Sequence, residues 1–498
     1  MNSHTSTSNH ATSSELAKQR RLLWKVDLYV LIPLTTLYFL SFLDRTNIAN
    51  ARIEGLKDDL QLTDPEYLNG LSFFFAGYII GEFPSVFALK WLSPPVWLPL
   101  LTMLWGLVAF LNGFMFTAPG YQAARFFLGL SEAGLFPGII YVISLYYKCS
   151  EQPLRIAIFF SAASLAGTFG GVLAYGISQI NAIGSQGWFH SWRWIFIIEG
   201  LVTILIGFCA FRFIPNDPLD AKFLKNGEEK KMLVKHISNG DMTDREPFEW
   251  KGVGAAFLDS KCWLYGLILH TLDLPQYTIA LFLPSIIKDM GFSAAQAQLL
   301  TVPPYALAFI TTITTAILCQ RYGYRAPFII IPAAIGIIGY IILLAVPTSQ
   351  SPGVAYLGTF FVLAGVFPAC AIVLSWPASN VSGKTKRATA CAGQIFIGFI
   401  GAIIGTQVYR NGSDSTPSYV LGHSVACGYL AMSIVFTMIT WLVLTRENER
   451  RRRALKDQGV LLPNYGDVGN NAARDGEFPI TEVPNWRRDE SLQWSFQT

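Results

Sequence analysis

The amino-acid sequence predicts an all-α membrane protein with twelve transmembrane helices in two halves of six. The chain has 498 residues, of which 52% are hydrophobic and only 14% are charged, against roughly 25% charged in an average soluble domain. Its 42 glycines indicate the same class, because Gly is more frequent in membrane helices than in soluble ones. The charged residues are also clustered between long apolar runs, as expected for spans joined by polar loops.

Twelve segments are long enough to cross a hydrocarbon layer of roughly 30 Å, which needs about 20 residues per helix. These predicted spans are residues 26–47, 67–90, 97–116, 121–147, 156–180, 192–213, 262–287, 297–319, 327–346, 353–376, 388–409 and 420–445. The strands of a membrane barrel would alternate apolar and polar residues, and these segments do not.

A long charged segment, residues 214–260, separates the first six spans from the last six. We therefore expect an N-terminal six-helix bundle over residues 24–213 and a C-terminal one over residues 261–445. Residues 1–23 are polar and rich in Ser and Thr, so we expect a disordered cytoplasmic tail there. Residues 446–498 are expected to form a basic cytoplasmic tail, and part of the linker could form an amphipathic surface helix.

The distribution of Lys and Arg predicts that both termini are cytoplasmic. Most of the 37 Lys and Arg, including the run RENERRRR at 446–453, fall in segments that this topology places inside, where positive charge is in excess. A nucleic-acid partner is not expected, because no water-exposed domain carries a basic stripe. We expect a monomer in the lipid bilayer of the plasma membrane, with the vacuolar membrane as the alternative.

Cysteine spacing and sequons indicate little covalent or metal chemistry. None of the seven cysteines lies in a predicted outside loop, and none belongs to a metal-ligand pattern, so we expect no disulfide, metal or other cofactor. Asn411, in an Asn-Gly-Ser sequon on the outside, is a candidate for glycosylation.

The two halves resemble each other in sequence. AGLFPG at 133–138 in span four recurs as AGVFPA at 364–369 in span ten. Arg155 at the start of span five likewise corresponds to Arg387 at the start of span eleven. Internal repeats at this spacing indicate a duplicated six-helix unit.

Span four contains two charged residues, Arg125 and Glu132, in otherwise apolar surroundings. They are separated by about 10.5 Å along a helix, and Gly129 shares their face. An ion at the bilayer centre costs from about 2.5 kcal/mol upward, so such residues usually face a wet cavity or a partner. The repeat puts Tyr356 and Leu363 at the matching positions, and this asymmetry favours function over a salt bridge that only locks two helices.

Span one ends with a similar pair, Asp44 and Arg45. Neighbours in sequence do not face each other on a helix, so each should find a different partner, on span four, five or seven. The alternative is an ordinary helix cap at the outer surface.

Further polar residues lie inside the predicted spans. Glu82 in span two is a candidate to line the cavity, and the alternative is a hydrogen bond that steadies a kink at Pro84. His270 and Asp273 in span seven could meet on one face, either as a buried pair or as a second titrating site.

Two more polar residues are predicted to contact a ligand. Tyr277 in span seven, beside a proline, is expected to line the pore. Gln394 in span eleven is expected to donate a hydrogen bond to the ligand, with a link between helices as the alternative. The glycine rows at 167–171 and 398–405 lie within spans, where close helix packing explains them better than a phosphate loop.

Taken together, seven stretches resemble the anion:cation symporter family of the major facilitator superfamily, particularly its fungal allantoate/nicotinate permease branch. They lie between about residue 40 and residue 430 and read LDRTNIANARIEGL, GYIIGEFPS, RFFLGLSEAGLFPG, RIAIFFSAASLAGTFGG, WRWIFIIEG, ALFLPSII and SNVSGKTKRATA. The resemblance implies the major facilitator fold and a transporter rather than an enzyme. It also implies proton-coupled uptake of a small organic anion by alternating access.

By the same resemblance, Arg45 and Arg125 would hold the substrate carboxylate, while Asp44 and Glu132 would carry protons. The planar guanidinium suits this role because it binds carboxylate bidentately. Competition between the substrate and Glu132 for Arg125 would then couple proton to solute. An efflux carrier that exports a metabolite is the alternative, because the residues do not encode a direction.

The chain departs from the family pattern at three places. The charged signature after span two is reduced to LKWLSPPVW, which keeps only Lys90, and the loop CQRYGYRAP after span eight has Gln320 in place of an acid. Asp273 has no counterpart in the pattern, and we hypothesise that it meets a cationic group on the substrate.

Overall fold

The computed structural model describes residues 17–148, 151–178, 190–219, 221–224, 226–238, 249–346, 351–409, 419–457 and 496–497. Within these ranges the regular structure is entirely helical, as predicted. Eleven of the described helices are long and apolar enough to cross a membrane. The remaining predicted span, α12 (Ser260–Asp289), has 30 residues, but its polar residues His270, Asp273 and Gln276 lower its mean hydropathy.

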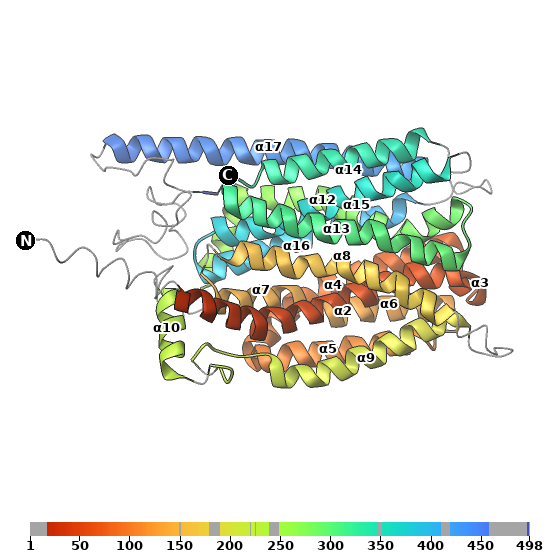
Figure 1. Ribbon diagram of the computed structural model, residues 1–498, viewed down its shortest axis with the longest axis horizontal. Helices are drawn as coiled ribbons and strands as arrows, with labels where there is room; N and C mark the ends of the chain where they lie inside the picture. The colour runs from red at the N-terminus through yellow and green to blue at the C-terminus, as the bar shows by residue number, and fades with distance from the viewer. Residues whose placement is uncertain are drawn as a thin grey trace, which may run out of the picture.

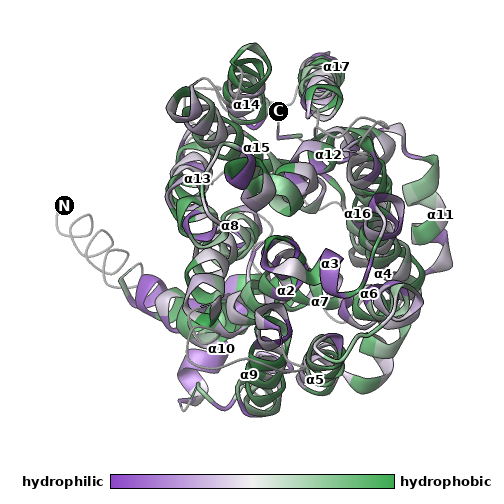
Figure 2. Cartoon of the chain, turned by 90° about the vertical axis from the view of Figure 1, so that its right-hand side faces the viewer, coloured by the Kyte–Doolittle hydropathy of each residue, from purple (hydrophilic) through white to green (hydrophobic). Residues whose placement is uncertain are grey.

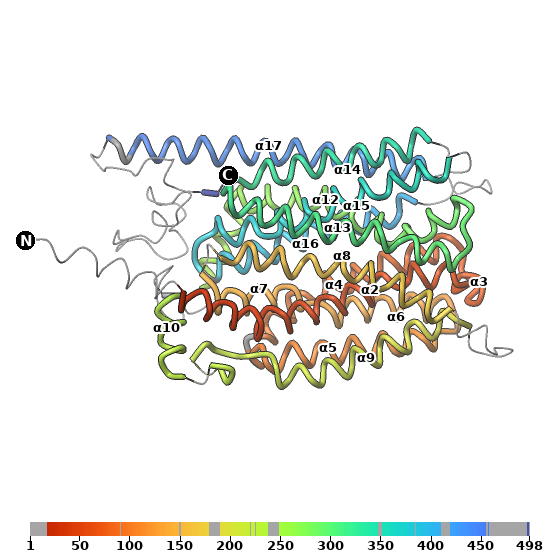
Figure 3. Tube along the Cα trace, viewed as in Figure 1, coloured from red at the N-terminus to blue at the C-terminus, as the bar shows by residue number. Residues whose placement is uncertain are grey.

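The helices form two bundles that lie side by side with nearly parallel axes (Figures 1 and 3). The N-terminal half contains η1 (Asp27–Leu31), α2 (Ile32–Ala51), η2 (Arg52–Leu56), α3 (Lys57–Asp59), α4 (Asp64–Leu92), α5 (Pro94–Asn112), α6 (Ala118–Glu132), α7 (Leu135–Tyr146), α8 (Gln152–Ser178) and α9 (Ser191–Phe213). The linker contains α10 (Gly227–Ser238) and α11 (Trp250–Leu258). The C-terminal half contains α12, α13 (Ala294–Tyr322), α14 (Pro327–Ala345), α15 (Pro352–Asn380), α16 (Lys384–Val408) and α17 (Val420–Asp457).

The two halves meet along α8, α13 and α15 on one side and along α4 and α16 on the other. The end-on view in Figure 2 shows these contacts as the seam between the two groups of helices. Large apolar side chains on the outer faces are exposed, for example Phe208 and Ile310. These apolar outer faces are suited to contact with lipid, while many polar side chains are buried inside the bundle.

Both ends of the helical region extend beyond their predicted limits. The first helix begins at Ala17, so residues 17–23 are helical rather than disordered, and Leu22 on it is buried. At the other end, α17 continues past residue 445 to Asp457. Two ion pairs between residues four apart support this extension, as is usual for a helix in water.

The amphipathic surface helix of the linker is α10. Glu229 of this helix forms an ion pair with Lys25, with 2.7 Å between Oε2 and Nζ. His236 Nε2 lies 3.1 Å from a carboxylate oxygen of Glu151. Burial acts against ionisation of Glu151, but His236 and Arg155 outweigh it and hold the pKa of that carboxyl below its usual value. These contacts attach the linker helix to the N-terminal half.

Span four is broken, although the sequence suggests one continuous helix. Helix α6 ends at Glu132, and α7 begins at Leu135. Between them Gly134 has φ +92°, and a Cβ on it would lie 1.8 Å from Ser85 Oγ. Only glycine fits a left-handed position with so little space. The break leaves Glu132 at a helix end inside the bundle.

The glycine rows pack helices closely, as predicted. A Cβ on Gly171 of α8 would lie 2.5 Å from the Gln298 carbonyl oxygen of α13. A Cβ on Gly401 of α16 would lie 2.2 Å from the His270 carbonyl oxygen of α12. Small residues let these backbones approach, which is how membrane helices gain packing energy.

Candidate functional site

A small cavity lies between the two halves near their centre. Its volume is about 30 Å³, room for one or two waters, since a water needs about 10–15 Å³. Its lining residues come from both bundles: Tyr38, Arg45, Tyr78, Phe136, Phe160, Leu269, Asp273, Gln276, Tyr277, Leu374, Ile395 and Phe399. In this conformation the cavity is too small for an organic solute.

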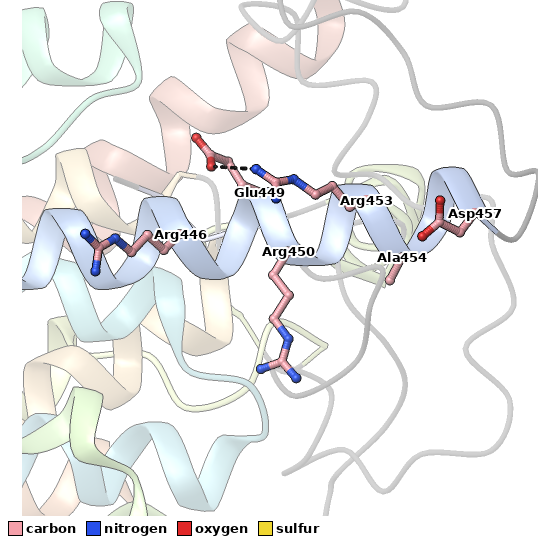
Figure 4. Close-up of a pocket in the computed structure, with 6 residues that line it drawn as sticks. All are labelled: Arg446, Glu449, Arg450, Arg453, Ala454 and Asp457. Atoms are coloured by element: carbon pink, nitrogen blue, oxygen red, sulfur yellow. Dashed lines mark ion pairs between the residues drawn. The ribbon is translucent and has the colours of Figure 1, made fainter.

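A larger hollow of about 420 Å³ lies against the protruding end of α17 (Figure 4). All six lining residues belong to that one helix: Arg446, Glu449, Arg450, Arg453, Ala454 and Asp457. Most of them are exposed, and their side chains point in different directions (Figure 4). This is an open basic surface, so the central cavity is the better candidate for a solute site.

Arg45 of α2 is the centre of the polar network. Its Nη2 lies 2.8 Å from Glu132 Oε2, and its Nη1 donates to the Tyr277 hydroxyl at 2.6 Å. The Ser41 hydroxyl donates to the same Glu132 oxygen at 2.9 Å. Arg45 is 3% exposed and Glu132 fully buried, so α2, α6 and α12 are joined through a desolvated ion pair. Such a pair requires both partners, because one alone would be a bare buried charge.

Aromatic rings surround the Arg45 guanidinium. Its carbon lies 4.9 to 5.9 Å from the ring centroids of Phe42, Phe74, Tyr78, Tyr277 and Phe399. Each ring face attracts a cation within about 6 Å. The cage therefore stabilises the positive charge where water has little access.

Arg125 of α6 is equally buried but poorly satisfied. Its Nη2 makes one long hydrogen bond, 3.4 Å, to the Arg45 carbonyl oxygen, and the guanidinium lies 5.1 Å from the Phe74 ring. Its Nε and Nη1 have no hydrogen-bond partner among the described residues. An unsatisfied buried donor costs about 1–3 kcal/mol, and more on a charged group. Two donor nitrogens of Arg125 are therefore unsatisfied inside the described part of the protein, although Arg125 is not among the residues that line the central cavity.

The predicted competition between Glu132 and a solute for Arg125 needs correction. In this conformation Glu132 is paired with Arg45 and not with Arg125. The reason is geometric, because seven residues separate the two α6 side chains by about 10.5 Å along the helix, whereas Arg45 reaches Glu132 from α2.

Asp44 points away from Arg45, as expected for consecutive residues on a helix. Its Oδ2 accepts hydrogen bonds from Trp105 Nε1 and Thr203 Oγ1, each at 3.1 Å. These partners lie on α5 and α9, which are spans three and six, so the expectation of span four, five or seven is wrong for Asp44. The same expectation is correct for Arg45, which contacts spans four and seven.

Glu199 of α9 is a candidate residue that the sequence reasoning missed. It is 3% exposed, neither of its carboxylate oxygens has a hydrogen-bond partner among the described residues, and it interacts electrostatically with Asp44. A signal was present, since Glu199 is the only acid in the apolar stretch WRWIFIIEG, which we used only for its resemblance.

The side chains of His270 and Asp273 on α12 do not meet. Asp273 lines the central cavity together with Tyr277, and Gly398 leaves space for its carboxylate. His270 points elsewhere, with Nδ1 3.1 Å from the Ile397 carbonyl oxygen. The structure thus contradicts a cavity role for His270 and a His270–Asp273 pair, because the His270 ring contacts the Ile397 carbonyl oxygen of α16 while Asp273 lines the cavity.

The predictions for Gln394 and Glu82 are also corrected by the structure. Gln394 Nε2 donates to the carbonyl oxygens of Tyr265, at 3.3 Å, and Val373, at 3.0 Å, so its amide hydrogens link three helices and are not free for a ligand. Glu82 is buried with no hydrogen-bond partner among the described residues, but it is absent from the cavity lining. Asn411 lies outside the described residues.

Sequence comparison gives matches along most of the chain. The profile of the Major Facilitator Superfamily matches residues 34–406. An uncharacterized transporter of Schizosaccharomyces pombe is 32% identical and covers 91% of this chain and 88% of its own length. The high-affinity nicotinic acid transporter of Saccharomyces cerevisiae is 31% identical, with coverage of 87% and 79%.

Solved structures match the fold at low sequence identity. The xylose transporter XylE from E. coli, in a partially occluded inward-open conformation, superposes with a TM-score of 0.62 at 15% identity and covers 82% of this chain and 97% of its own. A bacterial homologue of the human lysosomal transporter Spinster, inward-facing and occupied, gives 0.61 at 15% identity, with coverage of 84% and 97%.

Proposed function

Because this chain belongs to the Major Facilitator Superfamily, we propose that it is a proton-coupled symporter that takes up small organic anions by alternating access. Members of this family are carriers and not enzymes. The relatives of this chain include a transporter of nicotinic acid, which is a carboxylic acid. That likeness supports a carboxylate as the substrate.

The observation that carries the proposal is a buried acid–arginine pair beside a second arginine with free donors. Arg45 and Glu132 neutralise each other, while Arg125 has two donor nitrogens without partners among the described residues. The guanidinium has five N–H donors in a fixed fork that matches a carboxylate. An incoming anion would satisfy Arg125 first and could then bridge to Arg45.

Coupling follows when the substrate takes Arg45 from Glu132. Without the guanidinium, an ionised Glu132 would be an unpaired buried charge, so it binds a proton instead. When the substrate leaves, Arg45 pairs with Glu132 again and the proton is released. By linkage, protonation of Glu132 must strengthen anion binding as much as anion binding favours protonation. We assign Asp44 a second proton-carrying role, with Glu199 as its neighbour.

Asp273 adds a selectivity element. It lines the cavity from the C-terminal half, while Arg45 lines it from the N-terminal half. A substrate with a carboxylate at one end and a basic nitrogen at the other would find complementary groups on both bundles. Rocking of the halves about this shared site would expose it to each side in turn.

Hydrogen bonds join the two halves at one end of the bundle, and we infer that this end is closed in this conformation. Glu54 accepts a hydrogen bond from Gln298 at 2.9 Å, and Gln407 donates to Ser72 at 2.6 Å. With both termini cytoplasmic, as we propose, these contacts lie at the outer end. We further propose that the protein works as a monomer in the plasma membrane.

Uptake in intact cells tests this function. Cells that express the chain should accumulate labelled nicotinate, or another small carboxylate from a panel, faster at pH 5 than at pH 7, and a protonophore should abolish the difference. Cells that express Arg125→Ala serve as the matched control. Accumulation below that of the control cells would instead indicate the efflux carrier, and uptake that ignores the proton gradient would refute the symport.

A further inference from the structure

A short segment far along the chain, Phe496–Gln497, is bound in the end of the C-terminal half. It lies beside the protruding end of α17, at the C label of Figure 1. Phe496 is only 3% exposed. Because the position of this segment is fixed by side chains of several helices, we call the surrounding groups the terminal cleft, defined by Lys261, Arg325, Trp376, Asn380, Asn448 and Arg451.

Two asparagines of the terminal cleft each bind both main-chain polar groups of one residue of the segment. Asn448 accepts from the Phe496 amide nitrogen at 2.9 Å and donates to its carbonyl oxygen at 3.0 Å. Asn380 accepts from the Gln497 amide nitrogen at 2.8 Å and donates to its carbonyl oxygen at 2.9 Å. Trp376 Nε1 donates to that same carbonyl oxygen at 2.8 Å. All five hydrogen bonds are made to main-chain groups of the segment, so they do not depend on its side chains.

The side chains of the segment are recognised separately. Arg451 and Lys261 lie 4.6 and 5.3 Å from the Phe496 ring centroid, on α17 and α12, so the ring has cation–π contacts from two helices. The Gln497 amide oxygen accepts from Nε of Arg325 at 2.8 Å and also from its Nη2. Arg325 belongs to the loop CQRYGYRAP, where the sequence departs from the family pattern.

We propose that the terminal cleft is a peptide-binding site, that its ligand is an extended aromatic–glutamine segment, and that residues 496–497 of this chain occupy it reversibly. The backbone contacts supply affinity, while the aromatic and amide pockets supply specificity. The covalent tether keeps the segment at high effective concentration, so a free peptide competes only when the segment is absent or weakened. Docking joins the ends of α12, α15 and α17 to the loop before α14, independently of the transport site.

Peptide binding to purified protein tests the site. The probe is a fluorescent peptide with the sequence SLQWSFQT of residues 491–498, and the receptor is a chain that lacks residues 496–498. We expect saturable binding by anisotropy, at least tenfold weaker to the full chain, whose own segment fills the cleft. A peptide with Ala in place of Phe should bind at least tenfold more weakly. Equal binding to the full and shortened chains, or no binding to a folded shortened chain, would overturn the proposal.

Point variants of the full chain keep the test valid if the shortened chain is unstable. Phe496→Ala should open the cleft to the peptide, and Asn448→Ala, which removes both main-chain hydrogen bonds to Phe496, should not. The melting temperature of the double variant should be no lower than that of the worse single variant, because either change releases the same docked segment. Fully additive losses would mean that Asn448 and Phe496 act independently, against a shared site.

Discussion

Arg45 and Arg125 present the same guanidinium and are buried to nearly the same extent, yet their surroundings differ. Arg45 has an acid, a hydroxyl and five aromatic rings, whereas Arg125 has one long hydrogen bond and one ring. Charges buried without full hydrogen bonding are costly. This difference underlies the roles that we propose, in which Arg45 exchanges partners during the transport cycle and Arg125 binds the incoming anion.

Substitution of Arg125 by Lys keeps the charge and removes the fork. We expect the apparent affinity for the carboxylate to fall at least tenfold, about 1.4 kcal/mol, because a point charge cannot make the bidentate contact. Concentration dependence of initial uptake measures this. Arg446→Lys, at an exposed position on α17, is the matched control and should change nothing. An unaltered affinity in Arg125→Lys would remove Arg125 from the binding site.

At this scale the sequence predicts which charged residues are buried better than it predicts their partners. Charges such as Glu132 inside apolar runs stand out because burial of an ion is expensive. The partner depends on how helices are rotated and crossed, which no local pattern determines. Thus the partner of Asp44 is expected on span four, five or seven, but Asp44 accepts a hydrogen bond from Trp105 of span three. Gln394 donates to backbone carbonyl oxygens rather than to a ligand.

Among the helical elements, the break between α6 and α7 has the clearest consequence. It ends α6 at Glu132, and interrupted helices often mark the substrate and ion sites of transporters. The sequence does not reveal this break, because Gly134 is one glycine among many. Glycine is required at position 134 because φ is positive and because Ser85 of α4 leaves no space for a Cβ. Both features depend on the tertiary structure and not on the local sequence.

Substitution of Gly134 by Ala tests the break. The left-handed conformation costs a residue with a Cβ about 1–2 kcal/mol, and the overlap with Ser85 adds to this, so we expect a melting temperature lower by several degrees and reduced uptake. Gly176→Ala is the matched control, since a Cβ there meets nothing within 4 Å. Equal melting temperatures for the two variants would show that the break is not under this constraint.

Across the whole molecule, the fold is the best-predicted feature. Long apolar runs, clustered charges and the repeat at 364–369 specify twelve helices in two halves, since each feature follows from the lipid environment or from duplication. The ends of the helical region are predicted less well, because a helix can continue beyond the apolar span. Ion pairs such as Glu447–Arg451 stabilise it there in water. The conformational state is not predicted, because it depends on weak contacts between the halves.

The attachment of the linker to the C-terminal half gives a pH-dependent prediction. Asp259, between α11 and α12, lies 3.0 Å from both Lys261 and Lys386. Burial opposes its ionisation, but the two lysines outweigh this and hold the pKa of Asp259 below its usual value. A lowered folded-state pKa adds stability that is present above the unfolded-state pKa, about 3.9, and that is lost as pH falls through the folded value.

Asp259→Asn should therefore melt at a lower temperature than the parent chain at pH 7, and the gap should close as the pH is lowered below about 4. Asp457→Asn, at the exposed end of α17, is the control and should melt like the parent at every pH. Thermal unfolding in detergent at several pH values measures both. A gap that stays constant with pH would mean that the ion pairs do not stabilise this junction.

The exchange of Arg45 between Glu132 and the substrate is tested most directly by Glu132→Gln. The amide cannot bind and release a proton, but it leaves both arginines free to hold the anion. In liposomes with an acidic exterior, this variant should lose accumulation above the equilibrium level while it still exchanges labelled for unlabelled substrate. Retained accumulation, or equal loss of accumulation and exchange, would contradict the account.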